Sequence, residues 1–468
     1  MKPSNLTEKF AECLSENDMI GEVRGWALLG ISSLALAGVF AVALALSRVP
    51  GIENSFPWPL GFFEKGLVIH VVFSFVVWFL AVFGVFLTVM TTLSPNILLK
   101  GFGPQAVWAG VIGVILLAVP GFLDRSEASL NNYVPVIIDP LYYSGLVIFA
   151  AALGLVVLRF LANARRAAKG WGINHTDYIE MAVASSFIIV AALACFLLAY
   201  LPRIGDVIDA RFNEDVFWGG GHALQFLNTF LMLSGWYLLA HQFLGKRPVK
   251  PLVLRTVVIL CVVPPALMPL LYAFFSPDSG ALVYIFTDLQ YLLAPPVAVM
   301  GGAILLSLKD HLAGRKLPFD DIAFLCLFLS CMTFAIGGFL GLFVDGADTR
   351  TPAHYHAVIA AINIVFMGMF LNFVLPIIGR AIDLSRKCRV LVWLYAVGQM
   401  VASIGLFLAG GYGVPRKTAG GEQGLEAIGA KIGLYMNGVG AAIAVIGGIM
   451  FIWICARALL RKQNRIQS

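Results

Sequence analysis

Long apolar segments dominate the chain, each about 20–28 residues long and separated by short polar stretches. Segments of that length, without the tight-turn residues that separate barrel strands, predict membrane-spanning helices. About twelve are expected, over roughly residues 25–48, 65–93, 104–123, 141–163, 177–201, 217–242, 253–276, 281–307, 320–344, 353–379, 389–412 and 428–457. The pattern therefore predicts an all-α integral membrane protein.

Polar segments also precede the first apolar segment and follow the last one. Residues 1–24 precede the first apolar segment and show no cleavable signal pattern, so the first helix is expected to be retained. We expect a cytoplasmic N-terminal segment over 1–24, a single twelve-helix membrane domain over 25–460 and a cytoplasmic C-terminal tail over 461–468. No internal repeat is evident, which disfavours a transporter built from inverted repeats.

Composition and charge agree with this interpretation. Of the 468 residues, 60% are hydrophobic and 12% are charged, which is more apolar surface than a soluble core can bury. Of the 32 Lys and Arg residues, 23 fall on the side of the N-terminus and 9 on the other side. This bias predicts cytoplasmic N- and C-termini in a bacterial inner (cytoplasmic) membrane. The net charge of +6 then reflects the bias of basic residues toward one side of the membrane. Membrane lipid is an expected partner, and nucleic acid is not.

The cysteines exclude several kinds of site. None of the seven forms a CxxC or CxxCH motif, and most lie inside predicted helices. This argues against a disulfide framework, a zinc site and covalently attached heme c.

Four of the seven histidines lie inside apolar segments: His70, His222, His354 and His356. Each is a few residues from the predicted outer end of its helix, so all four are expected at a similar shallow depth. His354 and His356 are two residues apart, and about 200° of helical rotation sends them to opposite sides of one helix. Ionisable residues inside a membrane mark functional sites, and imidazole is a common axial ligand of heme iron. The histidines therefore predict hemes near the outer face.

Four sequence motifs occur in an order typical of one superfamily. They are LVIHVVFSFVVW around His70, FWGGGHALQFLNT around His222, TPAHYHAV around the histidine pair, and GYGVPRKT after the eleventh helix. With these motifs the chain resembles the catalytic subunit (subunit I) of the heme–copper oxidase superfamily, which includes cytochrome c oxidases and nitric oxide reductases. The FWGGG motif is most similar to that of the C-type (cbb) oxidases. The resemblance covers nearly all of the twelve helices and implies the subunit I architecture.

The resemblance implies two hemes. His70 and His356 would be the axial ligands of a low-spin heme, and His354 would be the single proximal ligand of a high-spin heme. Arg416 and Lys417 would pair with heme propionates. Three residues just before the histidine pair would help to organise that edge: Asp345, Asp348 and Arg350.

The chain departs from the family at the metal that faces the high-spin heme. In oxidases, copper B is held by one histidine on the sixth helix, matched by His222, and by an adjacent pair on the seventh. Leu270 and Leu271 occupy the positions of that pair, and Phe226 occupies a position where some oxidases carry a cross-linked tyrosine. The sixth and seventh helices also lack the glutamates of nitric oxide reductases. Copper B is thus in doubt, and His222 is a candidate for a residual copper or non-heme iron site.

Three functions compete. The first is a respiratory oxidoreductase acting on dioxygen or nitric oxide, with His354 and His222 as catalytic residues in a pocket lined by His222, Leu270 and Leu271. The second is a divergent diheme protein that transfers electrons or senses gas without copper B or proton pumping. The third, a twelve-helix transporter, leaves the four motifs unexplained. Metal content and turnover with a reductant distinguish the first two. Since we see no soluble domain, we expect an electron-donating subunit or a c-type cytochrome as partner.

Overall fold

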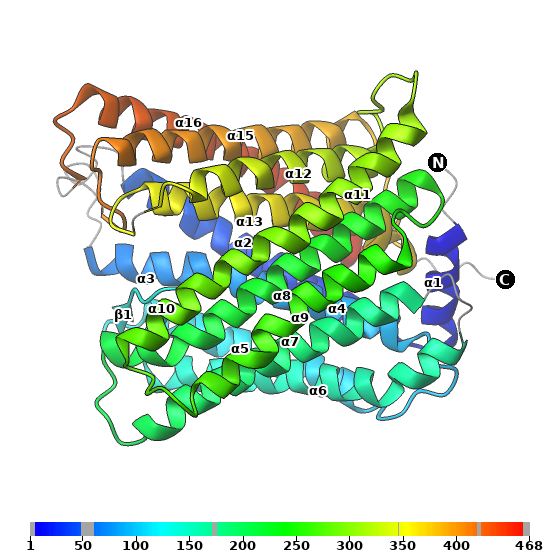
Figure 1. Cartoon of the computed structure of the whole chain (residues 1–468), viewed down its shortest axis with the longest axis horizontal. Helices are drawn as coiled ribbons and strands as arrows, with labels where there is room; N and C mark the ends of the chain where they lie inside the picture. The colour runs from blue at the N-terminus through cyan, green and yellow to red at the C-terminus, as the bar shows by residue number, and fades with distance from the viewer. Residues whose placement is uncertain (1–4, 48–59, 171–175, 345, 419–422, 462–468) are drawn as a thin grey trace.

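The structure is a computed structural model that describes residues 5–47, 60–170, 176–344, 346–418 and 423–461. Among these residues, twelve helical spans are long and apolar enough to cross a membrane, which confirms the predicted number. The long helices run side by side as a bundle (Figure 1).

Seven of the spans are single helices: α2 (Ile20–Ser47), α6 (Pro140–Gly170), α8 (Ala210–Leu244), α9 (Pro251–Leu271), α12 (Ile322–Gly341), α15 (Arg386–Gly411) and α16 (Ile428–Leu460). The other five change helical form along their length. Two of them pass through π-helical segments: α3 (Leu60–Val71) through η2 (Val72–Val77) into α4 (Trp78–Thr91), and α13 (Arg350–Met369) through η6 (Phe370–Val374) into α14 (Leu375–Ile377). Three contain 3-10 turns: α5 (Phe102–Ala118) with η3 (Val119–Phe122), α7 (Thr176–Tyr200) with η4 (Leu201–Arg203), and α10 (Gly280–Leu289) joined by η5 (Gln290–Leu293) to α11 (Ala294–Leu312).

The spans that carry the four membrane histidines are the most deeply buried of the twelve. In the apolar 18-residue stretch of α8, 94% of the residues are buried inside the bundle. In the corresponding stretches of α3–α4 and α13–α14 the share is 83%. None of the other nine exceeds 56%, and the least buried, α10–α11, reaches only 22%. An ionisable side chain on a lipid-facing span would be costly, so its location in the interior of the bundle is physically expected. The fold therefore places the candidate site inside the bundle.

Helices α15 and α16 pack backbone to backbone through glycines. A Cβ atom on Gly440 would lie 2.7 Å from the carbonyl oxygen of Gly398, and one on Gly433 would lie 2.7 Å from that of Gly405. Real Cβ atoms essentially never approach so closely. Without a hydrophobic driving force in lipid, close packing of small residues is a main source of helix association. These glycines thus fix the distance between α15 and α16.

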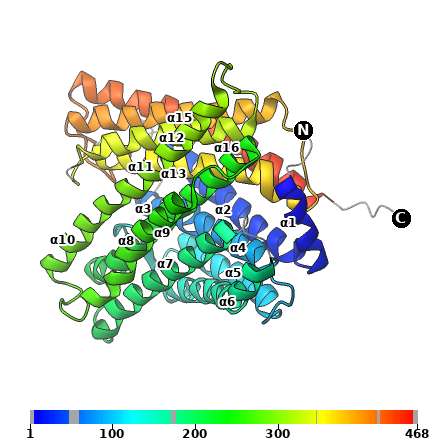
Figure 2. The same cartoon turned by 45° about the vertical axis from the view of Figure 1, so that its right-hand side comes forward.

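A short helix that the sequence did not lead us to expect, α1 (Asn5–Glu16), lies across one end of the bundle, here called the α1 end (Figures 1 and 2). Leu6, Phe10 and Leu14 recur every four residues and are buried against the bundle. The ring of Phe10 lies 5.3 Å from that of Phe373 in an edge-to-face contact. Residues 5–16 of the N-terminal segment therefore form an amphipathic helix, and α2 begins within the same segment at Ile20.

Buried ion pairs hold the α1 end together. Arg247 contacts both carboxylate oxygens of Asp177, at 2.7 and 2.8 Å, and the Tyr237 hydroxyl donates to the same carboxylate. Arg159 lies 2.6 Å from Glu22. The two-point contact of Arg247 fixes orientation as well as distance, and both ion pairs connect neighbouring helices. They join α7 to α8 and α2 to α6 near the cytoplasmic side expected from charge.

The opposite end, where α3, α8 and α13 begin, is here called the histidine end. Between α5 and α6 its chain forms a small antiparallel hairpin of β1 (Glu127–Ser129) and β2 (Val136–Ile138). The tip of this hairpin, residues 130–135, contains Tyr133, whose ring lies 5.5 Å from that of Trp218 in α8. The hairpin therefore places its tip against the part of α8 that carries His222.

Candidate functional site

His70 lies near the end of α3, just before the helix changes to π form. Its Nδ1 is 3.0 Å from the carbonyl oxygen of Ala37 in α2. A carbonyl can only accept, so Nδ1 carries the proton and the lone pair of the neutral imidazole lies on Nε2. The Ser74 hydroxyl donates to the His70 carbonyl at 2.6 Å, within the π-helical turn. Such turns are frequent at functional sites.

His354 is oriented in the same way by α12. Its Nδ1 is 2.8 Å from the carbonyl oxygen of Gly337, so the lone pair again lies on Nε2. The ring packs on Gly341, where a Cβ atom would come within 2.6 Å of Nδ1. Half-buried His356 follows two residues later, and helix geometry directs it about 200° away from His354.

The donor chemistry of His70 and His354 fits a heme iron. Metal-ligating histidines characteristically donate their other ring N–H to a carbonyl or carboxylate, which fixes the tautomer and the ring orientation. Ala37 and Gly337 supply such carbonyls. The absence of a side chain at Gly341 provides room for the His354 ring.

The turn after α15 lies against the start of α13. The Thr349 amide donates to the Val414 carbonyl at 2.9 Å, and the Arg416 amide donates to that of Ala347 at 3.4 Å. This contact brings the region of the histidine pair to the expected propionate partners, although they are more than sixty residues apart in the sequence. Asp345, expected to help here, lies outside the described residues.

Charged side chains gather at this contact. Arg350 pairs with Asp348, with a closest approach of 2.6 Å. The Lys417 ammonium donates to the carbonyl of Leu130 in the hairpin. Burial, and next the charge of Arg416, lowers the pKa of Lys417. Four of the five residues expected at the propionate edge thus lie in two segments that the fold joins.

His222 is enclosed by aromatic rings and is only 1% exposed. The centroids of Tyr133, Trp218 and Phe286 lie 4.3, 5.0 and 5.7 Å from its ring. Its Nδ1 is 2.8 Å from the Trp218 carbonyl, and its Nε2 is 2.9 Å from the Tyr133 hydroxyl. Both ring nitrogens are therefore bonded to protein groups.

Tyr133 was missed in the sequence, because a loop residue has no helical periodicity that indicates what it faces. Burial, and next the charge of Glu214, raises the pKa of Tyr133, and Arg416 opposes this. The phenol accordingly keeps its proton over the ordinary pH range. The signal that could have revealed it is the glycine run before His222. Each glycine leaves no room for a Cβ because an aromatic side chain packs against it, within 3.0 Å of where that atom would be: Gly219 with Tyr272, Gly220 with Phe196 and Gly221 with Tyr133.

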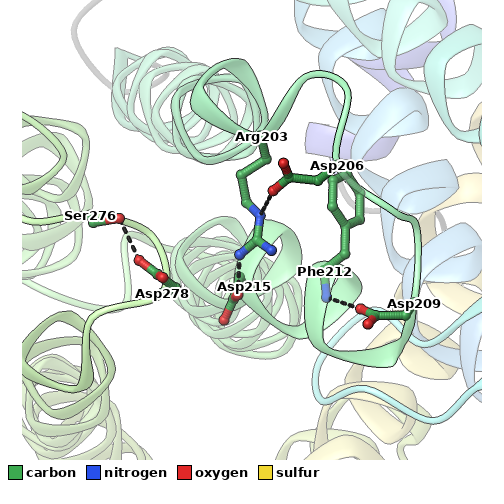
Figure 3. Close-up of polar contacts among 7 residues, drawn as sticks. All are labelled: Arg203, Asp206, Asp209, Phe212, Asp215, Ser276 and Asp278. Carbon is green, nitrogen blue, oxygen red and sulfur yellow. Dashed lines mark hydrogen bonds and ion pairs between the residues drawn. The ribbon is translucent and has the colours of Figure 1, made fainter.

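Polar contacts fix where α8 begins (Figure 3). The Asp209 carboxylate accepts from the Phe212 amide at 2.7 Å, which is a helix N-cap. Arg203 pairs with Asp206 at 3.1 Å and with Asp215, and its guanidinium lies 5.4 Å from the ring centroid of Phe212. With its start anchored, α8 holds His222 at a defined depth of twelve residues from its first residue.

Comparison with known proteins identifies the family. The profile of cytochrome c and quinol oxidase polypeptide I matches residues 23–450. The chain belongs to this family. Its resemblance to the heme–copper oxidase superfamily is confirmed, and with it the twelve-helix subunit I architecture. Members of the family carry heme and serve electron transport.

The relatives span nearly the whole chain. Cytochrome c oxidase subunit 1 of Thermus thermophilus is 22% identical, covering 94% of this chain and 84% of that protein. An uncharacterised protein of Aquifex aeolicus is 31% identical over 72% of this chain and 80% of its own length. One of Rickettsia prowazekii is 25% identical over 93% and 95%. A solved heme–copper terminal oxidase dimer matches with a TM-score of 0.77 and 18% identity, over 95% of this chain and 85% of that one.

Within this family, copper B is the group that the side chains do not fit. No cluster of three or more His, Cys, Asp or Glu side chains able to hold a metal occurs in the described parts of the chain. Leu270 is 59% exposed on α9, so the expectation that it lines the pocket of His222 is wrong. Met268, two residues before Leu270 and so on the opposite side of α9, is buried, and Leu271 is half-buried. Neither side chain replaces an imidazole.

Proposed function

We propose that this chain is a diheme membrane redox protein of the cytochrome c oxidase subunit I family. His70 and His356 hold a low-spin heme, and His354 holds a high-spin heme. It acts in respiratory electron transfer, with dioxygen or nitric oxide as the ligand at the high-spin heme. The observation that carries this proposal is the pair of imidazoles, His70 and His354, each bonded through Nδ1 to a backbone carbonyl inside the most buried spans.

The hemes would supply electron transfer and a site for a diatomic ligand. The protein supplies orientation and charge. Ala37 and Gly337 fix the tautomers of His70 and His354. Arg416 and Lys417 provide positive charge for propionates at the histidine end, where Lys417 is already desolvated.

Partners and location follow from the same considerations. Membrane lipid surrounds the exposed faces of the outer spans. An electron-donating subunit or a c-type cytochrome delivers electrons. The excess of 23 over 9 basic residues favours cytoplasmic termini in a bacterial inner membrane, with the hemes near the outer face.

A specific observation favours a second candidate function. The distal side, which is the side of the proposed high-spin heme opposite His354, offers the imidazole of His222, and this ring is already bonded to Tyr133. On α9, Leu270 points outward. Such a site favours electron transfer or gas sensing over a proton-pumping oxidase. Turnover of dioxygen or nitric oxide with an artificial reductant would support the oxidoreductase. Ligand binding without turnover would support the second function.

Single-histidine variants test the ligand assignment by optical and electron paramagnetic resonance spectra. His354→Ala should remove the high-spin signal and spare the low-spin heme, whereas His70→Ala should do the reverse. His311→Ala, at the α1 end of α11, is the control and should retain both. Retention of both signals in His354→Ala would rule out the assignment.

A further inference from the structure

We propose that Tyr133 closes the distal metal position on His222, so that this chain carries a metal-free tyrosine–histidine pair where relatives place copper. The proposal rests on the proposed function only in placing this pair beside the high-spin heme. The bond itself, between the Tyr133 hydroxyl and Nε2 of His222 at 2.9 Å, stands on the geometry of the protein.

The direction of this hydrogen bond follows from the second ring nitrogen. Nδ1 of His222 lies 2.8 Å from the Trp218 carbonyl, which can only accept. In a neutral imidazole Nδ1 therefore holds the proton, and Nε2 presents its lone pair. The Tyr133 hydroxyl must be the donor to Nε2. That lone pair is the one that a metal ion would need.

Hydrogen bonds to Glu214 and Lys417 hold the hairpin tip, and with it Tyr133, in position. Asn132 donates through its backbone amide to Glu214 Oε2 at 2.8 Å and through its side-chain amide to Oε1 at 2.6 Å. Two residues before Asn132, the Leu130 carbonyl accepts from Lys417. The residues just before Tyr133 thus tie the tip to α8 and to the turn after α15.

The backbone of Tyr133 is itself unusual. Its φ is +63°, in the left-handed region that a bulky residue rarely adopts. Such a conformation persists only where the surroundings impose it, and it is common at functional sites. Gly221 makes the approach possible, since a Cβ there would lie 2.8 Å from Cγ of Tyr133. The left-handed backbone of Tyr133, the missing side chain at Gly221 and the hydrogen bonds of the hairpin tip together hold the Tyr133 hydroxyl against His222.

A metal ion at Nε2 would have to displace the phenol, and little else is available to hold it. Two possible donors are buried on α9: the Met268 thioether, which is soft and weak beside a single imidazole, and the Cys261 thiol, which lies about two helical turns nearer the α1 end. The site therefore favours the hydrogen bond over the metal. A ligand at the proposed high-spin heme would then meet no second metal.

Copper affinity tests this without depending on heme. We would measure the apparent dissociation constant for Cu(I), by chelator competition, of the wild type and of Tyr133→Phe. Removing one competing neutral hydrogen bond should tighten binding about fivefold. Tyr143→Phe is the matched control, since its hydroxyl bonds to Asn213 at 2.8 Å, and it should equal the wild type. Adding His222→Ala should abolish the gain.

If Tyr133→Phe does not fold, a second variant still tests the proposal, and a second measurement gives an independent result. Glu214→Gln keeps the phenol and loosens the hairpin, so it should give a smaller gain in Cu(I) affinity. The infrared C–O stretch of a carbon monoxide adduct should shift in Tyr133→Phe and not in Tyr143→Phe. One copper per chain in the purified wild type, or equal Cu(I) affinity in Tyr133→Phe and wild type, would overturn the proposal. Absence of heme in the wild type would instead refute the proposed function and leave the copper result valid.

Discussion

Replacing Gly341 by alanine is expected to displace His354 from the carbonyl that orients it. Gly341 has no positive φ, so alanine strains no backbone there. The new Cβ would lie 2.6 Å from Nδ1 and 2.8 Å from Cε1 of His354. The conflict is therefore confined to the imidazole that we assign to the high-spin heme.

The size of the effect follows from these distances. Moving Nδ1 from 2.6 Å to the 3.4 Å of an ordinary contact requires a shift of about 0.8 Å. If the ring moves directly away from the Gly337 carbonyl, the same shift lengthens the 2.8 Å bond to roughly 3.6 Å, beyond hydrogen-bond range. Loss of one neutral hydrogen bond costs about 1 kcal/mol, or roughly fivefold in an equilibrium constant.

Heme titration and optical spectra would measure this effect. Gly341→Ala should lower the affinity for the high-spin heme several-fold and leave the low-spin heme of His70 and His356 intact. Gly338→Ala is the control on the same helix, since nothing lies within 4 Å of its Cβ position. An identical high-spin spectrum and heme affinity in Gly341→Ala and Gly338→Ala would refute the reasoning.

Two further predictions concern the stability of the bundle, measured by thermal unfolding in detergent. Gly440→Ala should force α15 and α16 apart and cost about 1–3 kcal/mol, whereas Gly438→Ala, with nothing within 4 Å, should cost nothing; equal midpoints would contradict the glycine packing. Asp177→Asn leaves Arg247 without its buried carboxylate and should cost about 2–4 kcal/mol. Asp320→Asn, whose carboxylate is 91% exposed in its pair with Arg389, should have no measurable effect, and a loss as large as that of Asp177→Asn would contradict the importance of burial.

The membrane helices could be predicted because each must satisfy its backbone internally and is long and apolar enough to be recognised alone. The same rule made His70, His222, His354 and His356 conspicuous, since each interrupts an apolar run. These four histidines lie on the three most buried spans, as the cost of an ionisable side chain in lipid requires. The sequence pattern did not predict which spans would be the most buried.

Features that depend on tertiary contacts could not be predicted. The outward direction of Leu270 depends on how α9 is rotated in the bundle, which three internal prolines help to set. Tyr133 and the carbonyls of Ala37 and Gly337 reach the histidines across gaps of 17 to 89 residues. Helix α1 was overlooked because its apolar face comprises only a few residues within a polar segment.

The iron and copper content per polypeptide of the purified protein decides whether this chain holds two hemes and a metal-free distal pair. We expect two irons and no copper, with one low-spin and one high-spin heme in the spectrum. One copper per chain would contradict the metal-free distal pair, and a protein purified without iron would contradict the diheme assignment altogether.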